Sequence, residues 1–542
     1  MVGHTVAEII GHVVYSFTRS VAERYNFSEE VDENSRLLGY NPLDDTGLEW
    51  YCRPTDDLIY QEYSNSGATM CNYLASSQVH ARFRDACSIE DKEPTQVVAA
   101  EDRGMAWKRI RPSLFSSLWK SFYFGFLISI LSATLVGMVS ILVYYLSYQT
   151  LLKCEGFSTK SIPIKIQRMR TISEVIISSV YFYWFFVNTL FYFRPFQISG
   201  LKLKLFFLCL AFYVMDVAYR ICFQAFGITR TNLTKMQKLP LIALFFLCVC
   251  IEVCLIARHL CQGPRKMLCR LFLLTTTPCI LSYAAAVVIA YLIYPAYRGE
   301  GKSGKMVIAI FTPLIPLVVK GVSRPCVQRL ARFSPPGTSF VLLVPLYCGS
   351  AVMQRLLQVD LGFFKFESVV VIGVIHGVAE VVERSTMVLI DHISNQVLER
   401  RKVPWGGFRT PRRERLATDI NIMSMLYESS AIITVNGYLY LYQYFYTSDN
   451  SPLFLLKSFA ITTSATLTIE WFFTSVSIAI ETRYQNMPIM KVWRKTWKTH
   501  ILVAVINMLV IAVWVSTYLF IAIKENATAE NNNNCEMPFT RL

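Results

Sequence analysis

The sequence predicts an all-α polytopic membrane protein with about 11 transmembrane helices and a cytoplasmic N-terminal region. The chain has 542 residues, 53% of them hydrophobic, and a mean hydropathy of +0.38. Apolar runs of about twenty residues recur along it, and about twenty residues are needed to cross a hydrocarbon core of roughly 30 Å. A soluble domain does not need such repeated runs. We therefore expect a lipid bilayer to be the main partner of the chain.

The formal net charge of +15 has two interpretations. A basic chain can bind nucleic acid, but we find no nucleic-acid motif in this sequence. In membrane proteins Lys and Arg collect in cytoplasmic loops and beside anionic lipid. The second interpretation fits the hydropathy, so we expect no nucleic-acid partner.

Residues 1–115 are polar and mixed in charge, which predicts a partly ordered cytoplasmic region. The first ten residues lack the basic start of a cleaved signal peptide. Two short patterns in this region resemble cytoplasmic sorting signals that clathrin adaptors bind. Their residues are Glu33, Leu37 and Leu38 for one pattern, and Tyr40 and Leu43 for the other. They favour an endosomal or lysosomal membrane, with the plasma membrane as the alternative, although such short patterns also arise by chance.

A transmembrane helical domain is expected over 116–524. The first five apolar ranges are long, Pro313, Pro316 and Pro345 interrupt the sixth and seventh, and the eighth to tenth carry polar residues. Ten or twelve spans therefore remain open. The ranges are 118–146, 172–194, 202–226, 239–259, 270–297, 306–322, 338–358, 367–391, 420–447, 454–481 and 499–523.

Loop charge predicts the orientation, because cytoplasmic loops carry an excess of Lys and Arg. The loops 392–419 and 482–498 are strongly basic, whereas 448–453 has no basic residue. Counting from these loops places the N-terminus in the cytoplasm and the C-terminus on the other side. The basic loop 147–171 disagrees, because the same count places it outside.

Two Asn-x-Thr triplets fall outside in this orientation. They begin at Asn232 and Asn526 and predict glycosylation. The Asn-rich end of the chain, 525–542, is expected to be a disordered extracytoplasmic tail.

The eighth range is apolar enough to span a bilayer, yet it is strongly charged. His376, Glu380, Glu383, Arg384 and Asp391 share one face at helical spacing. A charge at the bilayer centre costs about 2.5–3.5 kcal/mol on the insertion scale. These side chains are therefore expected to face a protein interior or a wet cavity, with Arg384 paired to the adjacent Glu383.

Polar residues also line the ninth and tenth ranges. The ninth carries Glu428, and the tenth carries Glu470 and Glu481. Other members of these faces are Asn421, Ser424, Asn436, Thr463, Thr466, Thr474 and Ser477. Hydroxyls alone indicate interhelical hydrogen bonding, but a buried Glu needs a partner, a proton or water.

These observations predict a proton or substrate pathway between the eighth, ninth and tenth spans, with structural ion pairing as the alternative. Its expected residues are His376, Glu380, Glu383, Glu428, Glu470 and Glu481. The pair His376 and Glu380 has the spacing of a metal-ligand pair, but a closed site needs three or four ligands. No C-x-x-C pair occurs. We therefore expect no metal and no cofactor.

Three further features are assigned provisional roles. Asp216 and Arg220, four residues apart, are expected to form a structural ion pair. Glu252 has no local partner and is expected to pair with Lys320 across helices. The prolines near 278, 313 and 345 predict broken helices of the kind that line transporter cavities.

The function predicted from these features is secondary active transport of a small solute, coupled to protons. An ion channel and a receptor or scaffold are the alternatives. An enzyme is disfavoured, because few histidines lie within the apolar ranges, and we assign no catalytic residue. The sequence does not indicate the solute.

Overall fold

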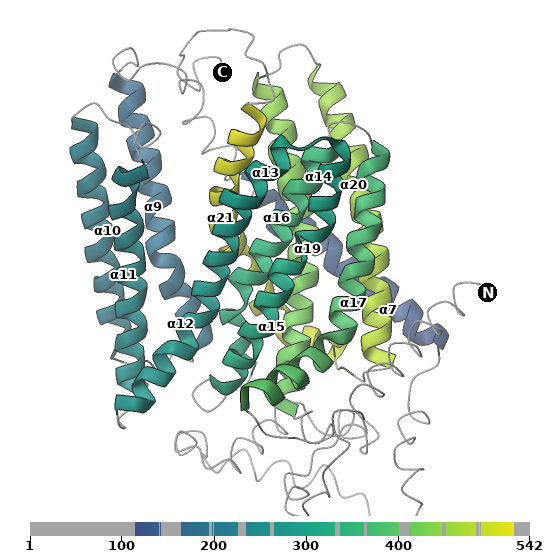
Figure 1. Cartoon of the computed structure of the whole chain (residues 1–542), viewed down its shortest axis with the longest axis horizontal. Coiled ribbons are helices and arrows are strands. Elements are labelled where there is room, and N and C mark those ends of the chain that lie inside the picture. The colour runs from purple at the N-terminus through teal and green to yellow at the C-terminus, as the bar shows by residue number, and fades with distance from the viewer. Residues whose placement is uncertain are drawn as a thin grey trace, which may run out of the picture.

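The computed structural model describes residues 114–139, 141–142, 164–193, 198, 200–225, 235–260, 265–330, 337–362, 366–399, 411–446, 451–483, 487 and 489–524. Every regular element in these ranges is a helix, and the long helices stand side by side in a bundle (Figure 1). The all-α prediction is confirmed for this part of the chain.

The first half of the bundle begins with α7 (Leu114–Leu131), which continues into a π-helical turn, η3 (Ser132–Gly137). The next helices are α9 (Ile164–Tyr192), α10 (Lys202–Ala225), α11 (Lys235–Leu260) and α12 (Arg265–Val288). A second π-helical turn, η5 (Ile289–Ile293), and α13 (Tyr294–Gly299) extend α12. In Figure 1, α9, α10 and α11 stand together at one side, and α12 runs obliquely from them toward the other helices.

The second half contains α14 (Lys302–Phe311), α15 (Leu314–Arg329), a 3₁₀ turn η7 (Ser339–Leu342) and α16 (Val344–Gly362). The last four helices are α17 (Phe366–Glu399), α19 (Pro411–Tyr446), α20 (Pro452–Arg483) and α21 (Ile489–Lys524). Within the described residues, each of the eleven apolar ranges found in the sequence overlaps one of these helices or consecutive ones.

Seven segments in the described part are long and apolar enough to cross a membrane. They are Ser117–Gly137, Glu174–Tyr192, Lys202–Phe223, Leu239–Leu260, Arg265–Val288, Ser303–Arg329 and Pro452–Thr482. By composition the chain is therefore a multi-pass helical membrane protein embedded in a lipid bilayer. That all eleven ranges cross the bilayer stays a prediction.

The helices outside those seven segments, α16, α17, α19 and α21, pack closely against their neighbours. Residues 415–439 of α19 are all buried, and α19 packs against α16, α20 and α21. A helix enclosed by other helices can carry polar and charged side chains, because it does not present them to lipid. This explains why hydropathy alone does not identify α19.

The predicted proline breaks are confirmed only in part. The sixth range divides into α14 and α15 at Thr312 and Pro313, and α16 begins only at Val344, with Pro345 in its first turn. Proline is favourable there, because the first helical N–H groups have no helical acceptor. By contrast, α12 continues through Pro278, so no break occurs at that position.

One glycine allows the polar helix α17 to approach α20 closely. A Cβ added at Gly377 would lie 2.2 Å from Cδ2 of Phe473, far inside van der Waals contact. Small residues at such crossings let membrane helices pack tightly. This contact brings the charged face of α17 next to the polar face of α20.

Candidate functional site

Four helices bring a cluster of charged side chains together inside the bundle. Arg355 lies on α16, Glu380 and Arg384 on α17, Glu428 on α19 and Glu470 on α20. Glu380 is partly buried and the other four are buried. We call these five residues the charge cluster.

Arg355 links two carboxylates from different helices. Its Nη2 lies 2.5 Å from Oε2 of Glu470 and 3.4 Å from Oε2 of Glu428. Its Nη1 donates to Oε1 of Gln358 at 2.8 Å. The hydroxyl of Thr474 donates to the other oxygen of Glu470 at 3.2 Å. Arg355 thereby joins α16, α19 and α20 at one point.

The carboxylates of the cluster outnumber its cations. One oxygen from each of Glu380, Glu428 and Glu470 lies within 4.8 Å of the other two. Arg384 donates to Glu380 one turn earlier on α17, and Arg355 contacts the other two. Three carboxylates and two guanidinium groups carry one net negative charge when all are ionised. Burial makes an uncompensated charge costly, so a proton or another cation is needed to balance it.

Both guanidinium groups keep free donors. Nε of Arg355, and Nε and Nη1 of Arg384, are buried without a hydrogen-bond partner among the described residues. A guanidinium has five N–H donors in a fixed fork that suits carboxylate and phosphate oxygens. The unpartnered N–H groups are thus of the kind that oxygen acceptors satisfy.

A second row of ion pairs connects α15 to α17. Lys320 Nζ lies 2.9 Å from Oε1 of Glu383, and Arg324 Nε lies 3.3 Å from Oδ1 of Asp391. Gln328 donates to the other oxygen of Asp391 at 2.9 Å. Glu383 thus lies in this row, where Lys320 balances its charge. It does not join the group of three carboxylates.

Two predicted pairings are wrong. Arg384 pairs with Glu380 and not with the adjacent Glu383, because neighbours in sequence point in different directions from a helix, whereas residues four apart meet. Glu252 does not pair with Lys320. It accepts a hydrogen bond from the thiol of Cys209 on α10.

His376 lies one turn before Glu380 and binds α14. Its Nε2 donates to the backbone oxygen of Ala309 at 3.2 Å, because a carbonyl can only accept. Nδ1 is buried without a hydrogen-bond partner among the described residues. In this tautomer Nδ1 is an acceptor. His376 is absent from the groups of described residues whose ligand atoms converge closely enough for a metal.

The polar stripe of α20 is buried as a continuous face. Thr463, Thr466, Glu470, Thr474, Ser477 and Glu481 are all less than one-tenth exposed. Near its end, Ser477 donates to Oε1 of Glu481 at 2.9 Å, while Oε2 has no hydrogen-bond partner among the described residues. Near its start, Asn436 of α19 donates to Thr463 at 3.2 Å. The stripe therefore continues along α20 both before and after Glu470, the residue of the charge cluster on this helix.

Arg355 was not predicted as a site residue, although its charge inside an apolar range was a signal that could have revealed it. A buried network where α19 meets α21 was not predicted either. There Arg415 Nε lies 3.0 Å from Asp419, and Nε2 of His500 lies 3.1 Å from the same carboxylate. The ring of His500 stacks on Phe340. This network ties three separate segments together.

The predicted pair on α10 is confirmed and is larger than expected. Arg220 Nε lies 2.6 Å from Asp216, and its Nη1 lies 3.2 Å from Glu174 on α9. Ser178 also donates to Asp216. One guanidinium contacts carboxylates on both helices and so ties α9 to α10, which agrees with a structural role.

The predicted sorting residues (Glu33, Leu37, Leu38, Tyr40 and Leu43) and glycosylation residues (Asn232 and Asn526) lie outside the described residues. Comparisons with protein-family models, curated proteins and solved structures find no match for this chain. The site must therefore be interpreted from its own geometry.

Proposed function

We propose that this protein is a secondary active transporter that couples the movement of a small solute to protons. In this proposal all eleven helical segments cross the bilayer, and the charge cluster carries the coupling proton. The observation that supports it best is the excess carboxylate among Glu380, Glu428 and Glu470. Ionisable groups inside a membrane domain that face one another are typical of proton and ion pathways.

Arg355 gives the cluster a means of coupling. It contacts Glu428 on α19 and Glu470 on α20 with the same nitrogen. Protonation of one carboxylate removes its attraction for the guanidinium, so Arg355 binds the other more closely. Protonation thereby changes whether Arg355 holds α16 more tightly to α19 or to α20. A transporter needs such a link between charge and helix position.

The free donors of the two arginines supply the solute-binding part of the proposal. Arg384 and Arg355 each keep at least one buried N–H group without a partner among the described residues. A solute with carboxylate or phosphate oxygens would satisfy them. Its negative charge would also make proton uptake by the cluster more favourable, which couples the two events.

Irregular helix segments contact helices that carry the charge cluster. The π-helical turn η3 packs against α19, and Ser132 within it donates to the backbone oxygen of Leu426. The chain also breaks between α14 and α15 at Pro313. Such irregular turns are frequent at functional sites and at breaks in transporter helices.

The test begins with protonation, which can be measured without knowing the solute. The purified protein in lipid vesicles is examined by infrared difference spectroscopy during a pH titration. We expect a carbonyl band of a protonated carboxyl group that is lost in Glu428→Gln or Glu470→Gln. The exposed Glu300 in the α13–α14 connection gives a matched control, Glu300→Gln, which should keep the band.

Transport is then measured in the same vesicles with a trapped pH-sensitive dye and a panel of small carboxylates and phosphate esters. A proton influx that requires both solute and intact Glu470 supports the proposal. The structural alternative predicts no such carbonyl band and no dye response with any solute, together with lower thermal stability of the Gln variants. That combination would reject proton coupling.

We propose an endosomal or lysosomal membrane as the location, with the plasma membrane as the alternative. The two sorting patterns near residues 33–43 support it, since clathrin adaptors bind such patterns on cytoplasmic segments. An acidic compartment also supplies the proton gradient that the proposed transport uses.

A further inference from the structure

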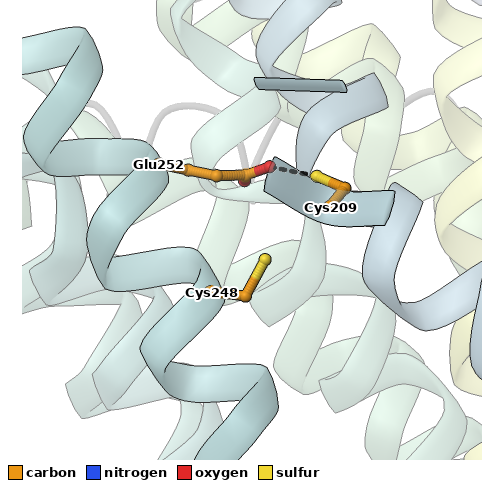
Figure 2. A group of neighbouring side chains, drawn as sticks. All are labelled: Cys209, Cys248 and Glu252. Carbon is orange, nitrogen blue, oxygen red and sulfur yellow. Dashed lines mark hydrogen bonds between the residues drawn. The ribbon is translucent and has the colours of Figure 1, made fainter. Parts of the chain in front are cut away.

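Two cysteines and a glutamate converge between α10 and α11, far along the chain from the charge cluster. Cys209 lies on α10, and Cys248 and Glu252 lie one turn apart on α11. Figure 2 shows the carboxylate of Glu252 directed at the sulfur of Cys209, with the sulfur of Cys248 turned toward both. The two sulfurs and one carboxylate oxygen all lie within 4.8 Å of one another.

These three side chains are buried from solvent. Cys209, Cys248 and Glu252 are each at most 1% exposed. The thiol of Cys209 donates to Oε1 of Glu252 at 2.6 Å. The other carboxylate oxygen, Oε2, is buried without a hydrogen-bond partner among the described residues.

No described Lys, Arg or His forms an ion pair with Glu252, unlike the acidic residues of the charge cluster. A thiol is only a weak hydrogen-bond donor and does not offset the burial of a carboxylate. The buried carboxylate therefore needs a proton or a bound cation, and the two sulfurs and the carboxylate oxygen lie close enough to bind a metal ion together.

The donor set selects the kind of cation. Thiolate sulfur and carboxylate oxygen together suit zinc, which is borderline soft and takes Cys, His, Asp and Glu ligands. Magnesium and calcium prefer oxygen donors alone. A tetrahedral zinc with Zn–S of about 2.3 Å and Zn–O of about 2.1 Å sets its ligand atoms roughly 3.5–3.8 Å apart. The present separations need adjustments of only about 1 Å to reach that geometry.

We infer that Cys209, Cys248 and Glu252 form a zinc site with three protein ligands. Zinc replaces the two thiol protons, which pass to solvent, so the net charge of the three side chains does not change, and the buried carboxylate gains a direct bond to the metal. The fourth coordination position is left to water or to a small ligand. The site also fastens α10 to α11, independently of the transport proposed above.

The test uses the full-length protein, purified in detergent under reducing conditions and freed of metal by a chelator. Zinc alone is added, and bound metal per chain is measured after equilibrium dialysis. We expect one zinc ion per chain that Cys209→Ser, Cys248→Ser and Glu252→Gln each weaken by at least about tenfold. Cadmium in place of zinc should give the ultraviolet charge-transfer band of a metal–thiolate bond.

Cys250 provides the matched control, because it lies on the same helix between two ligands but outside the converging group. Cys250→Ser should bind zinc as the unchanged protein does. The measurement on the unchanged protein keeps the test valid even if a ligand variant fails to fold. No bound zinc in the unchanged protein, or zinc bound without a cadmium–thiolate band, would overturn the inference.

Discussion

Arg355 is the residue on which the charge balance of the cluster depends. It contacts Glu428 and Glu470 across two helix interfaces, so its removal leaves two buried carboxylates without that cation. Breaking a buried pair by removing one partner costs about 3–5 kcal/mol. We expect Arg355→Met to lower the free energy of unfolding by an amount in that range, measured by thermal unfolding in detergent.

The double variant Arg355→Met/Glu470→Gln tests the reason for this loss. It removes one carboxylate together with the cation, so it should recover much of the stability that the single change loses. Equal losses in the single and double variants would mean that Arg355 acts through packing alone.

At the scale of residues, the sequence identified which carboxylates are buried but not all their partners. Glu428, Glu470 and Glu481 were predicted from helical spacing, and each is buried. Because residues four apart are neighbours on a helix, this spacing also places Arg384 beside Glu380. The link from Arg355 to Glu470 joins positions 115 residues apart, and no periodic pattern records a contact between separate helices.

At the scale of elements, the approach of α17 to α20 determines whether the cluster can form. We expect Gly377→Ala to destabilise the protein by about 1–3 kcal/mol, because the new methyl group would overlap the ring of Phe473. Thermal unfolding measures the loss, and the infrared band of the cluster should weaken in the same variant as Glu380 is displaced from Glu470.

Gly349 on α16 is the control for this change. A Cβ added there meets no atom within 4 Å, and alanine favours a helix interior by up to about 1 kcal/mol over glycine. Gly349→Ala should therefore keep or raise stability. A loss of equal size at both positions would show that general helix effects, and not the α17–α20 contact, are responsible.

Helix positions could be predicted well because apolar runs report them directly, whereas breaks could not. Pro313 and Pro278 both follow a threonine, yet the chain divides at the first and α12 continues through the second. The immediate sequence is therefore alike at the two positions, while the outcome differs. The sequence shows the proline but not whether the helix continues through it.

At the scale of the whole molecule, the predicted orientation depends on loop charge and on an odd number of spans. We expect a tag at the N-terminus to be accessible to protease in the cytoplasm and a tag at the C-terminus to be protected. The basic loops at 392–419 and 482–498 are the reason. Two exposed or two protected tags would require an even number of crossings.

The location of the whole molecule is tested by the pair Leu37 and Leu38. Replacing both by Ala should increase the share of protein at the cell surface several-fold, because adaptors would no longer bind this pattern. Surface biotinylation measures that share. Leu74→Ala, in the same region, should leave it unchanged, and an unchanged distribution for both variants would contradict the endolysosomal assignment.

The long-range bonds of Arg355 also affect how the chain is made. A ribosome adds about 5–20 residues per second, so α16 would wait roughly 6–23 s before position 470 is synthesised. Until then α16 carries a guanidinium whose carboxylate partners on α19 and α20 do not yet exist. If α16 crosses the bilayer, as proposed, we expect the nascent helix to stay beside the translocation channel until the later helices supply those partners.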